Sequence, residues 1–155
     1  MKNFLDKINK LSELKFITFS ILIALIFTIP FDIYHIYSNT YMGLKLITVW
    51  DFLLAIIILP IFKSILIVIV TYFIKQAIDN KFMITFISAI LLIGTQNYSV
   101  TYLLMVFIPS FIFVSAYTLY DNNKKLSSFL VMMIINLIYS IIQTGFIILA
   151  KNLIQ

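Results

Sequence analysis

The chain alternates long apolar runs with short polar breaks. Apolar runs cover about residues 16–37, 51–75, 82–97, 100–120 and 126–150, and most of the charged side chains lie outside them. A helix needs about 20 apolar residues to cross the hydrocarbon core of a bilayer. The pattern therefore predicts an all-α integral membrane bundle of about five transmembrane helices, the third of them short.

Residues 1–15 follow a different pattern. Their apolar side chains, Phe4, Leu5, Ile8 and Leu11, recur at helical spacing. The opposite face of this helix would carry lysine and acidic residues. This is typical of an amphipathic helix in the membrane interface. Because the run at 16–37 is a full-length span without a small-residue cleavage site after it, we expect this segment to stay in the mature protein. Residues 16–150 then form a single transmembrane bundle.

The composition agrees with this interpretation. Of 155 residues, 63% are hydrophobic and 11% charged, with a mean hydropathy of +1.10, far from the usual soluble composition. The absence of cysteine excludes disulfides, a thiolate nucleophile and sulfur metal sites. All eleven basic residues are lysine, and Ile and Asn are abundant, which indicates an AT-rich bacterial genome. We therefore expect a multi-pass protein of the bacterial cytoplasmic (plasma) membrane.

The distribution of lysine predicts the orientation. The N-terminal segment, the loop at 75–81 and the Lys124–Lys125 loop are basic, whereas the connector at 38–49, the turn at 95–99 and the C-terminal tail are poor in lysine. Cytoplasmic loops are the basic ones. Five spans with a cytoplasmic N-terminus and an external C-terminus fit this alternation. A four-span alternative, with the third run re-entrant, would place Lys124 and Lys125 outside.

The first span has a small or polar residue at every fourth position: Ser20, Ala24, Thr28 and Asp32. Side chains at this spacing share one helix face, and we expect this stripe to face other helices. Asp32 and the only histidine, His35, lie near the outer end of this span. We expect the pair at a solvated helix end. A metal or proton site there would need partners that the nearby sequence does not offer.

Lys63 lies near the middle of the second span, where a positive charge costs about 2.5–3.5 kcal/mol on insertion scales. We expect it to face the bundle interior or a watery cavity. Pro60 just before it, and Pro109 in the fourth span, predict helix kinks.

Several polar residues fall at a similar depth. At 1.5 Å per residue, Lys63, Gln96 and Asn136 lie roughly 15–21 Å from the cytoplasmic ends of their helices. Polar groups in hydrocarbon need partners. The sequence therefore predicts an intramembrane polar layer from three helices, built from Lys63, Ser64, Gln96, Asn136 and Ser140. Asn136, Ser140 and Gln143 also form one polar stripe on the fifth span.

The order and spacing of these residues resemble the CPBP family of intramembrane proteases, also called the Abi or CAAX-protease-and-bacteriocin-processing family. Its first motif is E-E-x-x-x-R or a variant, often shortly after a proline. Here Pro60 precedes the corresponding segment, in which Lys63 and Ser64 take the places of the two leading residues and Val68 that of the arginine.

The other two family motifs are matched in the same way. For F-x-x-x-H the chain has Leu92 and Gln96, and for H-x-x-x-N it has Asn136 and Ser140. The resemblance covers about residues 49–150. Family members use their glutamates and histidines to activate a water, by general-base action or with a metal. None of those residues remains, so the resemblance implies a degenerate, non-catalytic membrane protein with no metal and no cofactor.

Three functions stay open. Small members of this family resemble bacteriocin self-immunity proteins, so the first is immunity, by binding a bacteriocin peptide or another membrane protein. The second is a protease with altered chemistry, in which Lys63 acts as base for Ser140. The third is a small transporter or assembly subunit whose polar layer only joins helices. No phosphate-binding loop, zinc-hydrolase motif or basic soluble domain indicates a nucleotide-driven enzyme, a zinc hydrolase or a nucleic-acid binder.

Overall fold

The computed structural model describes residues 11–38, 49–94, 100–120 and 126–154 of the chain. Most of these residues are helical, with no strand among them, which confirms the all-α prediction. The helices are α2 (Glu13–Tyr37), α3 (Val49–Leu53), the π-helix η1 (Leu54–Ile58), α4 (Leu59–Lys75), α5 (Lys81–Gly94), α6 (Val100–Thr118) and α7 (Ser128–Ile154). Their bounds lie within a few residues of the predicted spans. Residues 1–10 of the expected amphipathic segment lie outside the described part, and Glu13 already belongs to α2.

Three helical stretches are long and apolar enough to cross a membrane: Glu13–Tyr37, Val49–Lys75 and Ser128–Leu153. The 14 residues of α5 rise about 21 Å, less than the ~30 Å hydrocarbon core. These findings are compatible with a membrane protein. The five-span topology and its orientation stay predictions, since Lys45, Lys124 and Lys125 lie outside the described residues.

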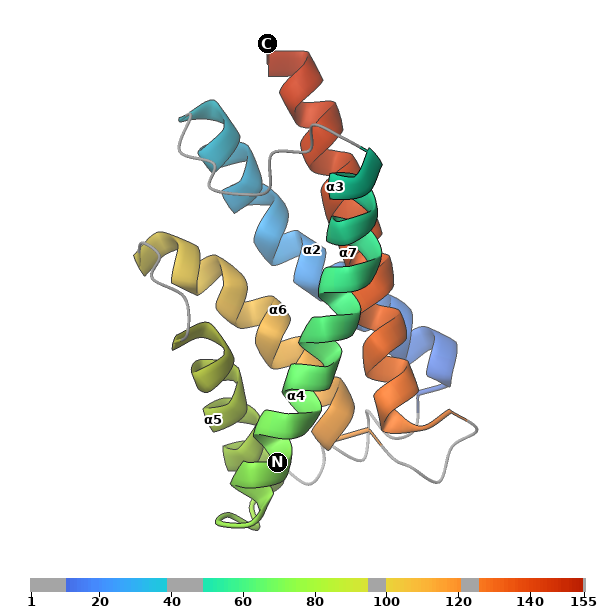
Figure 1. The fold of residues 1–155 in the computed structure, drawn as a ribbon, viewed down its shortest axis with the longest axis vertical. Helices are drawn as coiled ribbons and strands as arrows, with labels where there is room; N and C mark the ends of the chain where they lie inside the picture. The colour runs from blue at the N-terminus through green and yellow to red at the C-terminus, as the bar shows by residue number, and fades with distance from the viewer. Residues whose placement is uncertain (1–10, 39–48, 95–99, 121–125, 155) are drawn as a thin grey trace.

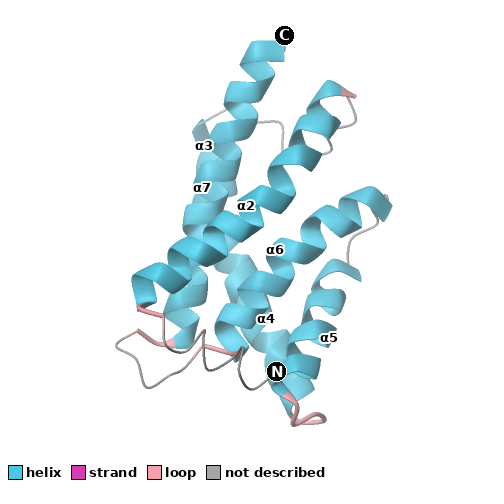
Figure 2. Cartoon of the chain, turned by 180° about the vertical axis from the view of Figure 1, so that it is seen from behind, coloured by secondary structure: helices cyan, strands magenta, loops and turns pink. Residues whose placement is uncertain are grey.

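Helices α6 and α7 pack against each other and against several of the other helices (Figure 1). Helix α7 packs against α2, α4 and α6, while α6 packs against α2, α4, α5 and α7. The view from behind shows α2 crossing in front of α7, with α5 and α6 side by side at one edge (Figure 2). Between them, α6 and α7 therefore contact every other long helix of the described chain.

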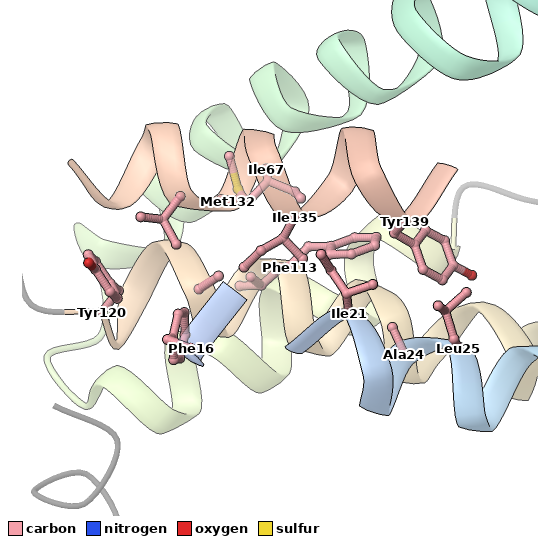
Figure 3. Packing of buried hydrophobic residues seen from close by; sticks show 13 residues of the cluster. Phe16, Ile21, Ala24, Leu25, Ile67, Phe113, Tyr120, Met132, Ile135 and Tyr139 are labelled. Carbon is pink, nitrogen blue, oxygen red and sulfur yellow. The ribbon is translucent and has the colours of Figure 1, made fainter. Parts of the chain in front are cut away.

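The hydrophobic core joins α2, α4, α6 and α7. Phe113 and Ile135 lie in its middle, with Phe16 and Tyr120 towards one end and Tyr139 towards the other (Figure 3). The rings of Phe113 and Tyr139 meet edge to face with centroids 5.3 Å apart, a favoured aromatic geometry. This core fixes α6 against α7.

The predicted stripe on α2 does face its neighbours. Ser20, Ala24, Thr28 and Asp32 are all buried. A similar stripe on α4 contains Pro60, Ser64, Ile67 and Thr71. The large apolar side chains outside these stripes are mostly exposed on the protein surface, as a bilayer requires.

The helix around Pro60 is irregular on its N-terminal side. Proline lacks an N–H and its ring clashes with the carbonyl four residues earlier, here that of Ile56. The structure has the π-helical turn η1 at this place, and α4 begins immediately after it. The disturbance that we expected at Pro60 therefore takes the form of a π-helical turn. Helix α6 runs on through Pro109, and α2 runs on through Pro30.

Candidate functional site: two intramembrane polar contacts

Part of the predicted polar layer forms a direct contact between α4 and α7. The Asn136 amide Nδ2 donates to the carbonyl oxygen of Pro60 at 2.8 Å and to Ser64 Oγ at 3.1 Å. Ser64 Oγ in turn donates to the same Pro60 carbonyl at 2.8 Å. Asn136 is 2% exposed and Ser64 is fully buried. We call these three residues the Asn136 node.

The local sequence explains why the node forms here. Side chains four residues apart share a helix face, so the Ser64 hydroxyl reaches the Pro60 carbonyl of the preceding turn. Asn136 carries two N–H donors that its own helix does not satisfy, and in hydrocarbon they need partners. Because α7 packs directly on α4, the amide finds its acceptors across the helix interface.

Lys63 is next to the node in sequence but its ammonium group contacts a different partner. Its Nζ lies 4.9 Å from the centroid of the Phe113 ring on α6. A cation over an aromatic face is attracted by the ring quadrupole. The side chain is half-buried, and no ion pair to it occurs among the described residues. Lys63 therefore faces the bundle, as predicted, with an aromatic ring rather than amides as its neighbour.

The remaining predicted layer residues have different outcomes. Gln96 lies outside the described residues, so its place in the layer stays a prediction. Ser140 is half-buried one turn beyond Asn136 on α7, and no hydrogen bond joins it to the node in the described part of the chain. Of the three helices predicted to form the layer, α4 and α7 meet in this contact. Lys63 lies instead against α6, which was not one of the three.

A second polar contact was missed by our reading of the sequence. Gln143 Nε2 on α7 donates to Asp32 Oδ2 on α2 at 3.0 Å. Asp32 is 0% exposed and His35 is 8% exposed. The expectation of a solvated helix end for this pair was wrong, because α7 covers this part of α2. The signal was present in two stripes, one ending in Asp32 and the other in Gln143, but nothing in the sequence paired them.

The hydroxyl groups of the bundle are satisfied mostly within their own helices. Thr28, Ser64, Thr71, Ser115 and Thr118 each donate to the carbonyl four residues earlier. One hydroxyl pair also crosses an interface, Thr85 Oγ1 with Thr118 Oγ1 at 2.5 Å between α5 and α6. On α7, the amides of Asn136 and Gln143 each make a long-range polar contact.

The chemistry available at the node is limited. Its groups are an amide, a hydroxyl and a backbone carbonyl, none of which titrates near neutral pH. Within the described residues no group of three or more histidine, cysteine or acidic side chains is placed to hold a metal ion. The node can hold helices together and present dipoles.

Comparison with known proteins found no matching family model, curated protein or solved structure.

Proposed function

We propose that the protein is a multi-pass protein of the bacterial plasma membrane that binds a peptide or another membrane protein without catalysis. Its specific role on this proposal is bacteriocin self-immunity, and it is related to degenerate proteins of the CPBP family. Two partners are required by the proposal: the lipid bilayer, and a membrane-active peptide or its receptor.

The observation that carries the proposal is the Asn136 node. Ser64 stands at a position of the first CPBP-like motif and Asn136 at a position of the third, and the two side chains are hydrogen-bonded 3.1 Å apart. Motif positions that act together on one water must adjoin in space. The contact supports a CPBP-like arrangement in which these positions have taken a structural role.

The same contact supports the absence of catalysis. The node has neither a carboxylate nor an imidazole, which are the usual proton acceptors of a general-base mechanism. The Asn136 amide is already occupied by Pro60 and Ser64. For the altered protease, Lys63 would have to approach Ser140, yet its ammonium group lies over Phe113.

Lys63 is the residue through which we expect the partner to be recognised. A lysine in the middle of a span is costly and usually serves a function. Its charge has no acidic partner among the described residues, so a bound peptide with a carboxylate at this depth would supply one. The Lys63 side chain is only half-buried, and the exposed apolar side chains next to it on α4, including Phe62 and Leu66, would contact the same helix or peptide.

The test is protection of a sensitive low-GC bacterium that expresses the protein and is challenged with peptides encoded beside its gene. We expect wild type to protect and Lys63→Met to protect poorly at equal membrane levels. Lys75→Met is the matched control, because Lys75 Nζ also lies 4.9 Å from an aromatic centroid, that of Tyr117, but at the end of α4. Absence of protection by wild type at normal membrane levels would refute the immunity role.

A small transporter or assembly subunit is the second candidate, and the buried Asp32–Gln143 contact favours it. Ionisable groups inside membrane bundles are commonly part of ion or proton pathways. In that case Asp32→Asn would abolish function while Lys63→Met would leave it intact. The immunity proposal expects the opposite pattern.

A further inference from the structure

Asp32 is the one acidic side chain of the described residues that has no exposed surface. One of its oxygens, Oδ2, accepts a hydrogen bond from the Gln143 amide at 3.0 Å. The other, Oδ1, is buried and has no hydrogen-bond partner. The carboxyl group is therefore half-satisfied, and its hydrogen-bond partner among the described residues is a neutral amide.

Within the described part of the chain, the helices that pack against α2 bring no lysine next to Asp32. Helix α2 packs against α6 and α7. On α7 the facing group is the neutral Gln143, and the nearest charged residue, Lys151, is eight residues further along. The sequence of α6 contains no Asp, Glu, Lys or His, and its titratable residues are Tyr102 and Tyr117. On α2 itself, the other buried titratable side chain within one turn of Asp32 is His35.

An ionised carboxylate in this position would be stabilised by one amide alone, inside a low-dielectric bundle. Buried charges are strongly unfavourable unless they are paired and fully hydrogen-bonded, and such groups are neutralised instead. A neutral carboxylic acid needs far less stabilisation from hydrogen bonds or nearby charges. Its Oδ2 can keep the bond from Gln143 while the proton resides on Oδ1. The space also restricts the ligand, because a side chain with no exposed surface leaves room for nothing larger than a proton.

We propose that Asp32 is an intramembrane proton-binding site, which holds one proton at neutral pH while α2 and α7 are packed together. This inference does not depend on the immunity proposal. Separation of α2 from α7 would break the bond from Gln143, let water reach the carboxyl group and release the proton. The α2–α7 interface is then the part of the bundle whose opening is linked to proton concentration.

Infrared spectroscopy tests the proposal on the full chain in lipid nanodiscs at neutral pH. A protonated carboxylic acid has a carbonyl stretching band that an ionised carboxylate lacks. We expect this band in wild type and its loss in Asp32→Asn, which keeps the size of the side chain. The matched control is Asp51→Asn, because Asp51 is half-buried near the start of its helix, and this variant should keep the band.

Absence of the band from wild type would overturn the proposal without any variant. Its persistence in folded Asp32→Asn would also overturn it. If Asp32→Asn does not accumulate, Asp32→Leu serves the same purpose, because it removes the carboxyl group and leaves an apolar side chain.

A stability measurement gives an independent readout. A free aspartate in an unfolded chain is ionised above about pH 4. The folded wild type would then bind one more proton than the unfolded chain, so its stability should fall as pH rises from about 5 to 8, whereas that of Asp32→Asn should fall less. Parallel pH profiles for the two proteins would contradict a proton bound at Asp32.

Discussion

Replacement of Asn136 tests whether the node holds α4 against α7. Asn136→Leu keeps the approximate volume of the side chain and removes both N–H donors. The bonds lost are those to the Pro60 carbonyl at 2.8 Å and to Ser64 Oγ at 3.1 Å. We expect the bundle to remain folded with lower stability.

The magnitude follows from what remains after the change. Interhelical hydrogen bonds in membranes contribute about 0.6 kcal/mol on average and up to about 1.7 kcal/mol. Two such bonds give about 1–3 kcal/mol. Ser64 Oγ still donates to the Pro60 carbonyl in the variant, so neither acceptor is left without a partner. The expected loss is therefore in the lower half of that range, about 1–2 kcal/mol.

The assay is SDS-driven unfolding in mixed micelles, followed by the fluorescence of the single tryptophan, Trp50. A double-mutant cycle with Ser64→Ala isolates the Asn136–Ser64 contact, for which we expect a coupling of about 0.6–1.7 kcal/mol. Ser140→Ala is the matched control on the same helix, since Ser140 makes no contact with the node among the described residues. It should change stability by about 0.5 kcal/mol or less.

Two results would refute this reasoning. Wild-type stability in Asn136→Leu would show that the node does not stabilise the bundle. A coupling of zero between Asn136 and Ser64 would show that the 3.1 Å contact has no energetic role.

Three further predictions use the same protein. Thr85→Val removes a hydroxyl contact between α5 and α6 and should cost about 0.6–1.7 kcal/mol in the unfolding assay; no change would contradict it. Phe113→Ala should lower the free energy of unfolding by about 3–5 kcal/mol, because the ring is 1% exposed in the core. Lys63→Met, which removes only the cation over that ring, should change it by about 1 kcal/mol or less. Equal losses in the two variants would contradict this difference. A single cysteine at Asn152 should react with an impermeant thiol reagent on intact cells, and one at Asn80 only after lysis, since the chain has no cysteine of its own; reaction of both on intact cells would rule out the five-span topology.

The sequence alone determined the helical class and the positions of the helices. Long apolar runs leave no alternative, because every backbone polar group in hydrocarbon must be satisfied within its own segment. The stripe that ends at Asp32 and the stripe of Asn136 and Gln143 on α7 were also visible, since both depend only on helical periodicity. Local hydroxyl bonds such as Ser64 to Pro60 follow from the same spacing.

The tertiary structure decided which stripe meets which. A helix with a polar face can place that face against any neighbour, and only the packing of α7 between α2 and α4 pairs Gln143 with Asp32 and Asn136 with Ser64. Depth along a helix predicted a common layer, but depth does not specify the direction of a side chain around the helix axis. For this reason Lys63 points to Phe113 and not to the node, and Asp32 is buried by a helix more than a hundred residues away in the chain.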